Sequence, residues 1–278
     1  MLTSGIPQMA EYGNAKRWRI SLIITTYNSL DTLKKVMASV LQQTLHPYEI
    51  IIADDGSNDG VNDVLAGFRK FSPVQIIHTW QPDNKFRLSR SRNLAGSKAR
   101  GNWLLFLDGD CVVPEYFLER HTELAESMNL IFGSRKLLSP FESEQLKIQD
   151  DGSLDLSSYL TGRKFIRLPL GLLRKLPRRS WERFRGFMMG VDTRLFQIVA
   201  GFDETYASWG LEDSDFAVRA TRVGGVLKDG RYSNAVLHIY HPEPSEQKKS
   251  ANSLAFEALL GQGESGRYKP LKSILIDC

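Results

Sequence analysis

The sequence contains few cysteines and no long apolar run. Only Cys111 and Cys278 are present in 278 residues, which excludes a small domain held together by disulfide bonds and fits a reducing compartment. No stretch approaches the ~20 apolar residues of a transmembrane helix. Residues 1–19 lack the apolar centre of a secretory signal peptide, and no internal repeat is present. These absences predict a globular cytosolic protein.

Charge is ordinary in amount but uneven in position. Lys and Arg number 36 against 32 Asp and Glu, a net +4, with 42% hydrophobic residues, which excludes a disordered or collagen-like chain. Residues 163–185 hold nine Lys or Arg and one Glu, a net +8, so the remainder carries −4. The protein is therefore an acidic body with one basic segment, and its pI near 9.0 gives little support to nucleic-acid binding.

Short apolar runs alternate with helical periodicity in the first half of the chain. The patterns predict strands at 19–26, 49–53, 74–78 and 102–107, and helices at 31–43, 60–70 and 88–100. This alternation is typical of a parallel sheet flanked by helices, in which ligands bind at the carboxyl ends of the strands. Polar groups follow three strands, at Tyr27, Asp55 and Asp108. We expect them to meet on one edge of the sheet.

The second half is less regular. Its residue patterns predict helices at 115–128, 211–223 and near 251–261, and strands at 187–192 and 236–240. Residues 139–162 are polar and acidic, which predicts a loop.

The triplet Asp108-Gly109-Asp110 directly follows a predicted strand. Its two carboxylates could hold a hard divalent cation, and that cation would neutralise the charge of a diphosphate. The alternative is that the triplet forms a solvated turn. His238 and His241 lie near the end of a later strand, and an imidazole among carboxylates would suit Mn²⁺ better than Ca²⁺. His241 is favoured of the two because it stands at the end of the predicted strand.

Three other segments carry candidate binding groups. Asp55 could accept a hydrogen bond from a base N–H, although its neighbours could equally cap a helix. Residues 84–92 supply Lys85, Arg87, Arg90 and Arg92 without any acid; they suit phosphate oxygens or form a solvated helix face. In residues 209–215 the aromatic ring of Trp209 could pack against a pyranose, and a carboxylate could accept the proton of a hydroxyl group. The alternative is that the acidic residues only complement the dipole of a helix that starts here.

Five segments resemble the family 2 glycosyltransferases of GT-A fold. Four are IITTYN (23–28), IIADDGSND (51–59), RSRNLA (90–95) and FLDGDC (106–111), and the fifth, WGLEDSD (209–215), is similar to the carboxyl-terminal region of galactosyltransferase-type enzymes. The latter include β-1,4-galactosyltransferases, polypeptide GalNAc transferases and bacterial chondroitin polymerases. The resemblance covers residues 19–243. It implies an α/β fold with a Rossmann-like, mostly parallel central sheet flanked by helices and a less regular acceptor-side half.

The resemblance also implies an activity. The expected enzyme is an inverting, metal-dependent transferase that uses Mn²⁺ or Mg²⁺ to move a hexose or N-acetylhexosamine, with galactose or GalNAc favoured. The expected donor is a UDP-sugar and the acceptor a glycan or lipid-linked hydroxyl. The implied organisation is an extension at 1–18, a nucleotide-sugar-binding half at 19–112, an acceptor-binding and catalytic half at 113–246 and a tail at 247–278.

Residue roles follow from the matching positions. Donor-binding residues would be Thr25, Tyr27, Asp55, Arg87, Arg92, Asn93, Asp108 and Gly109. Asp110 and Asp108 would be metal ligands, and His241 resembles a histidine that follows the last strand in some members. His238 stays a candidate metal ligand from its place in the predicted strand. Asp213 would be the catalytic base beside Glu212, and Trp209 and Gly210 would contact the acceptor.

Other functions stay open at this point. A metal-dependent nucleotidyltransferase would also place carboxylates near a nucleotide, but would not need Trp209 or Asp213. A non-catalytic nucleotide-sugar-binding domain is a further alternative. The basic segment 163–185 interleaves leucines with cations, so it could lie on an anionic membrane at the inner face, bind an anionic acceptor or form a solvated loop.

Overall fold

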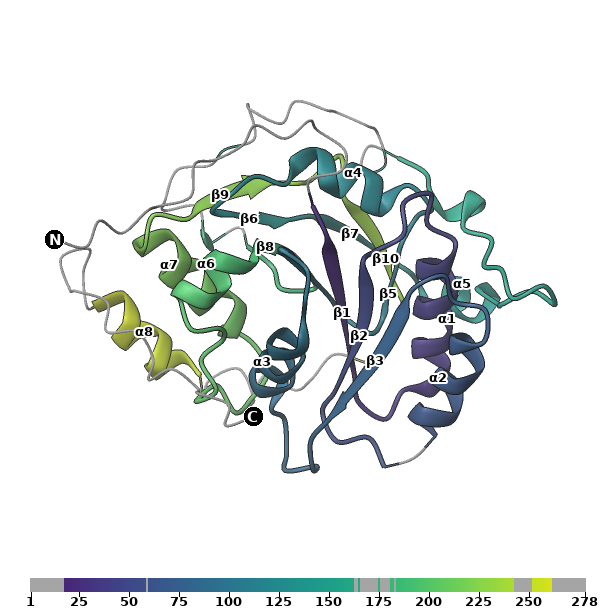
Figure 1. The fold of residues 1–278 in the computed structure, drawn as a ribbon, viewed down its shortest axis with the longest axis horizontal. Helices are drawn as coiled ribbons and strands as arrows, with labels where there is room; N and C mark the ends of the chain where they lie inside the picture. The colour runs from purple at the N-terminus through teal and green to yellow at the C-terminus, as the bar shows by residue number, and fades with distance from the viewer. Residues whose placement is uncertain are drawn as a thin grey trace, which may run out of the picture.

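The computed structural model describes residues 18–58, 60–162, 165, 175, 181–182, 184–242 and 252–261. These residues form a seven-stranded sheet, in the order β3-β2-β1-β4-β8-β6-β9, and a three-stranded sheet, β5-β10-β7 (Figure 1). The large sheet contains β1 (Ile20–Thr26), β2 (Glu49–Asp54), β3 (Gln75–Trp80), β4 (Trp103–Leu107), β6 (Asn129–Phe132), β8 (Met188–Asp192) and β9 (Val226–Asp229). The small sheet contains β5 (Cys111–Val112), β7 (Ser134–Leu137) and β10 (Ala235–His238).

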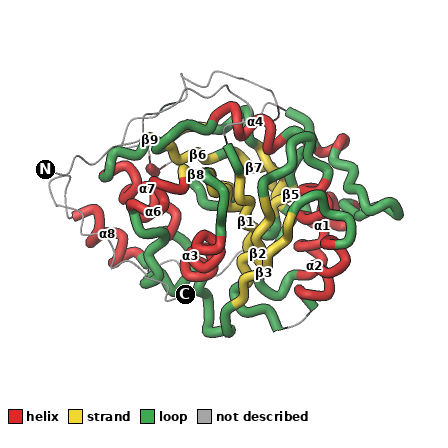
Figure 2. The backbone as a smooth tube through the Cα atoms, in the orientation of Figure 1, coloured by secondary structure: helices red, strands yellow, loops and turns green. Residues whose placement is uncertain are grey.

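Helices cover both faces of the large sheet (Figure 2). They are α1 (Leu30–Leu41), α2 (Val61–Arg69), α3 (Leu88–Lys98), α4 (Phe117–Leu124), α5 (Pro140–Gln145), α6 (Thr193–Ile198), α7 (Glu212–Arg222) and α8 (Ser253–Gly261). A core that includes Ile24 and Ile52 packs against α1 and α2, and a second core that includes Ile23 and Ile51 packs against α3, α6 and α7. Because both faces are covered, these strands are continuously apolar. Within the described ranges, no helix is long and apolar enough to cross a membrane.

The sheet confirms the predicted α/β class and is mostly parallel. β1 pairs in parallel with β2 and β4, and β2 with β3, whereas β8 is antiparallel to both β4 and β6. The predicted strands and helices of the first half are confirmed to within two or three residues at their ends. The strand predicted at 187–192 is β8, but its antiparallel direction was not predicted, because a short apolar run does not reveal the direction of a strand.

Parts of the second-half prediction were wrong. Residues 139–162 are not only loop, because Ser139 and Glu142 form a reciprocal capping box that starts α5. The helix expected over 115–128 covers only Phe117–Leu124, and the strand expected over 236–240 ends at His238. β6, β7 and β9 were missed, since four-residue strands are too short to show periodicity.

A buried histidine lies between α4 and the large sheet. The indole N–H of Trp103 donates to Nε2 of His121 at 2.9 Å, and His121 is fully buried. Burial lowers the pKa of His121 to about 3, so the ring is neutral in the folded protein and accepts the indole hydrogen bond.

This buried imidazole should make the fold acid-sensitive. In the unfolded chain His121 regains its ordinary pKa of about 6.5 and binds a proton that the folded state excludes. Stability is therefore complete above about pH 6.5 and is lost as pH falls toward the folded pKa, by about 1 kcal/mol between pH 6 and pH 5. Urea unfolding of wild type and His121→Gln at both pH values measures this, because the difference between the two proteins isolates the histidine. Equal acid losses in both proteins would contradict the assignment.

Candidate active site

Three parallel strands end at the same edge of the large sheet. The register pairs Thr26 with Asp54 and Ile24 with Leu107, so the residues that follow β1, β2 and β4 lie together. Gly109 allows the closest approach, because a Cβ there would collide with the carbonyl oxygen of Thr25. The predicted convergence of Tyr27, Asp55 and Asp108 therefore has its geometric basis in this register.

Asp55 is buried at the end of β2 with both carboxylate oxygens engaged. Gln81 Nε2 donates to Oδ1 at 2.5 Å, and the Arg87 backbone N–H donates to Oδ2 at 2.8 Å. Burial raises the pKa of Asp55, and the Arg87 N–H partly opposes this. Each oxygen keeps a lone pair for a ligand N–H. Sequence reasoning missed Gln81, because nothing in the local pattern points from residue 81 to residue 55.

Tyr27 and Arg87 lie close to Asp55. Tyr27 is half-exposed, and its hydroxyl donates to Asp83 Oδ2 at 3.1 Å. The Arg87 guanidinium donates to the carbonyl oxygen of Pro82, while the hydrogen bond from Arg87 to Asp55 comes from its backbone N–H. Thr25 is buried at the end of β1. Among Thr25, Tyr27 and Arg87, Tyr27 is therefore the most exposed residue.

The Asp108-Gly109-Asp110 triplet meets two histidines, His238 at the end of β10 and His241 just beyond it. β10 is antiparallel to β5 with His238 opposite Cys111, which brings its Nε2 to 3.3 Å from Asp110 Oδ2. His241 Nε2 lies 3.1 Å from the same oxygen. One ligand atom from each of Asp110, His238 and His241 lies within 4.8 Å of the others. A nitrogen and oxygen donor set of this kind fits Mn²⁺ or a similar divalent ion.

Electrostatics link the members of this cluster. Burial works to raise the pKa of Asp110, but the hydrogen bond from His241 and the charge of His238 lower it overall. The hydrogen bond to Asp110 raises the pKa of His241 to about 9, whereas burial lowers that of His238. The aspartate therefore stabilises positive charge beside it.

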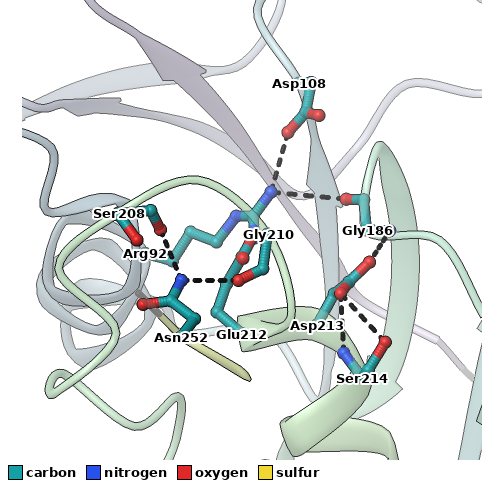
Figure 3. A network of polar contacts seen from close by, with 9 residues as sticks. All are labelled: Arg92, Asp108, Gly186, Ser208, Gly210, Glu212, Asp213, Ser214 and Asn252. Atoms are coloured by element: carbon teal, nitrogen blue, oxygen red, sulfur yellow. Dashed lines mark hydrogen bonds and ion pairs between the residues drawn. The ribbon is translucent and has the colours of Figure 1, made fainter. Parts of the chain in front are cut away.

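Arg92 is buried between two carboxylates from opposite halves of the chain (Figure 3). It is 1% exposed, with Nη2 2.7 Å from Asp108 Oδ1 and Nη1 3.3 Å from Glu212 Oε1. Its guanidinium also lies over the ring of Phe202. Arg92 therefore faces inward from α3 and joins the strand that carries Asp108 to the start of α7.

Glu212 and Asp108 both have raised pKa values. Burial and the neighbouring charge of Asp213 raise the pKa of Glu212 to about 7, although Arg92 opposes them. Burial and the charge of Asp110 raise the pKa of Asp108 to about 6, again against Arg92. Oε2 of Glu212 is buried and has no partner among the described residues. Perturbed carboxylates that share one cation are typical of catalytic sites.

Asp213 is oriented by backbone groups at the start of α7 (Figure 3). The Gly186 N–H donates to Asp213 Oδ2 at 2.6 Å and the Ser214 N–H to Oδ1 at 2.7 Å. A side chain at residue 186 would collide with Asp213, since an added Cβ would lie 2.8 Å from its Cβ. Sequence reasoning missed Gly186, because its contribution is a backbone donor 27 residues away.

The remaining predicted residues flank this centre. Trp209 is 42% exposed at the turn before α7, and Gly210 has a left-handed φ of 92°. Asn93 does not face the cluster, because its amide donates to the carbonyl oxygen of Phe202 at 2.9 Å and accepts from the Phe202 N–H at 2.8 Å. Asn93 thus anchors the loop after α6, next to Arg92 on the same helix.

Comparison with known proteins places this arrangement in a class. The structure resembles a solved complex of GalNAc-T7 with UDP, GalNAc and Mn²⁺ (TM-score 0.60, 16% identity, 88% of this chain and 48% of that one). It also resembles Staphylococcus aureus TarS 1–349 in complex with UDP (TM-score 0.59, 16% identity, 81% of this chain and 61% of that one). The fold is therefore that of the GT-A glycosyltransferases.

Sequence matches identify the family. Residues 21–157 match the model described as glycosyl transferase family 2, and residues 172–242 match the model described as N-terminal domain of galactosyltransferase. Chondroitin synthase from Escherichia coli is 24% identical over 85% of this chain. Residues 21–157 of this chain therefore belong to the family 2 glycosyltransferases. The whole chain spans 36% of the length of the chondroitin synthase.

Proposed function

We propose that this chain transfers a hexose or N-acetylhexosamine, of galactose or GalNAc type, from a UDP-sugar to a hydroxyl of a glycan or lipid-linked acceptor. The observation that carries the proposal is the Asp108–Arg92–Glu212 chain. It joins the strand ends of the donor half to the start of α7, where the candidate base lies. A nucleotidyltransferase would not require this second carboxylate group or the exposed Trp209.

The donor half suits a uracil nucleotide. A carboxylate oxygen of Asp55 with a free lone pair can accept the N3–H of uracil, whereas cytosine presents an acceptor at that position. Tyr27 offers an exposed ring beside it. Both the GalNAc-T7 and TarS structures contain UDP, which supports a UDP-sugar as donor for this chain.

The metal-binding groups fit a divalent cation on chemical grounds. Asp110, His238 and His241 would hold it, with Asp108 beside them. When bound, such an ion would neutralise charge on the diphosphate leaving group. Arg92 acts on this region through Asp108, because its guanidinium is buried against that carboxylate.

Asp213 would act as the catalytic base. Its Oδ1 accepts hydrogen bonds from both the backbone N–H and the hydroxyl of Ser214, whereas Oδ2 accepts from the Gly186 N–H and retains a lone pair for a proton. The acceptor oxygen would give its proton to Asp213 and attack the anomeric carbon. The bond from that carbon to the diphosphate oxygen breaks, and UDP departs with the electron pair. One displacement of this kind inverts the anomeric configuration.

A cytoplasmic location and contact with the inner face of a membrane remain predictions made from the sequence. Most of residues 163–185 lie outside the described residues; Lys175, which is described, pairs with Lys228 of β9 in an antiparallel bridge and with Glu126 at 3.1 Å. Sedimentation with acidic and neutral vesicles at low salt would test membrane contact by this segment.

UDP release tests the proposed function directly. The protein is incubated with UDP-Gal, UDP-GalNAc, UDP-Glc and UDP-GlcNAc, with Mn²⁺ or Mg²⁺ or with EDTA. We expect release from at least one donor, loss of that release in EDTA, and at least a hundredfold loss in Asp110→Ala with metal present. The exposed Asp63→Ala on α2 is the matched control. Metal-independent release, or release unaffected by Asp110→Ala, would reject the metal assignment.

A further inference from the structure

Helix α8 lies beyond both family-matched ranges but packs against α7, the helix that carries Glu212 and Asp213. Its Phe256 and Leu259 are buried with Tyr206 and Val218, and Leu211 packs against the same cluster. Figure 1 shows α8 beside α7, on the side of the molecule away from α1 and α2. No function was predicted for this helix, because the motif-bearing segments of the sequence end near residue 243.

Asn252 immediately precedes α8 and contacts the turn that carries Trp209. Its Nδ2 donates to the carbonyl oxygens of Ser208 at 2.8 Å and Gly210 at 2.6 Å (Figure 3), and the residue is 4% exposed. Both partners are acceptors, so the nitrogen of the amide must face them. Because these carbonyls flank residue 209, one side chain closes the turn around Trp209.

The turn that Asn252 closes determines how helix α7 begins. Gly210 and Leu211 both have left-handed backbones, with φ of 92° and 75°. A residue with a Cβ keeps this conformation only where surrounding contacts hold it. The Asp215 N–H then donates to the carbonyl oxygen of Leu211 at 2.8 Å, which begins the helix. The direction in which α7 presents Glu212 and Asp213 therefore depends on this turn.

Helix α8 also contacts the segment that orients Asp213. The rings of Trp181 and Phe256 pack edge to face with centroids 5.1 Å apart. The Phe184 N–H donates to the Trp181 carbonyl oxygen at 2.9 Å, and the chain then reaches Gly186, the backbone donor to Asp213. Helix α8 therefore packs against both the residues that precede α7 and the segment that leads to Gly186.

We propose that Asn252 is a positioning residue for the acceptor. By closing the 208–211 turn on α8, it holds Trp209 at the site and sets the approach of the acceptor hydroxyl to Asp213. This inference rests on the proposed transferase function, and it assigns an acceptor role to a residue outside the shared glycosyltransferase motifs.

Two variants of Asn252 isolate its hydrogen bonds. Asn252→Ala removes the donor, and Asn252→Asp keeps the shape but places an acceptor against two carbonyl oxygens. Leu254→Ala is the control, because Leu254 is 77% exposed on the same helix. Hydrogen–deuterium exchange should become at least tenfold faster for amides of residues 208–214 in both Asn252 variants, while peptides from β1 and β4 stay unchanged. Wild-type exchange at 208–214 in both variants would overturn the proposal.

Enzyme kinetics distinguish a role in positioning the acceptor from a general loss of activity. With a donor accepted by the wild type and a panel of p-nitrophenyl monosaccharides as acceptors, we expect the acceptor KM to rise about tenfold in both variants. The donor KM should stay within twofold of wild type, because Asp55 and the Asp110 cluster lie on other elements. An unchanged acceptor KM, or equal losses for donor and acceptor, would overturn the inference. If the wild type releases no UDP, the proposed function fails, while the exchange measurement still decides whether Asn252 holds the turn.

Discussion

Replacing Asp213 with Asn is expected to lower sugar transfer by about a thousandfold, since removing a general base costs 10² to 10⁴ in rate. The amide cannot take the acceptor proton, and its NH₂ group would face either the Gly186 or the Ser214 backbone donor. Donor binding should survive, because Asp55 and the Asp110 cluster lie on other elements. The measurement is transfer rate alongside UDP affinity by calorimetry.

The matched control for this experiment is Asp63→Asn, the same chemical change at an exposed position of α2. Anomeric configuration of the wild-type product, read by NMR, tests the inverting course at the same time. Transfer by Asp213→Asn within tenfold of wild type would remove Asp213 from the role of base. Glu212, with its raised pKa and unpaired oxygen, would then be the next carboxylate to test.

Replacing Arg92 with Leu is expected to destabilise the fold by about 3–5 kcal/mol, the usual cost of breaking a buried ion pair from one side. Asp108 and Glu212 would lose the guanidinium that they share, and Glu212 is 7% exposed. Because each kcal/mol shifts the melting temperature of a domain of this size by about 2–4 °C, a loss near 10 °C is expected in thermal unfolding. Arg90→Leu is the control, since Arg90 is exposed on the same helix.

A double-mutant cycle tests the physical reason for this loss. Adding Glu212→Gln to Arg92→Leu removes one unpaired carboxylate, so the double variant should recover part of the lost stability. Additive losses, or an Arg92→Leu variant that melts with the wild type, would show that the buried ion pairs are not formed in solution.

Much of the candidate site could be predicted because it depends on local patterns. Asp55 and Asp108 directly follow apolar strands, and parallel strands bring their carboxyl ends to one edge. Arg92 was also found, but as part of a basic run suited to phosphate. The structure turns it inward, whereas Arg90 on the same helix is exposed; a run of like charges does not reveal which member will be buried.

Other contacts could not be predicted, because they join segments distant in the sequence. Gln81 reaches Asp55 across 26 residues, and Asn252 reaches Gly210 across 42. Gly186 contributes only a backbone N–H, which every residue except proline carries. A single amide or backbone donor leaves no periodic signal, so neither composition nor spacing could assign a partner.

The sequence by itself determined the order of strands and helices in the first half, and which chemical groups follow the strands, because hydrophobic periodicity and strand ends are local properties. Only the tertiary structure decided that β10 brings His238 to Asp110, that Arg92 joins Asp108 to Glu212, and that Asn252 closes the turn before Asp213. These outcomes depend on antiparallel pairing, burial and packing between distant segments, which are fixed only when the whole chain has folded.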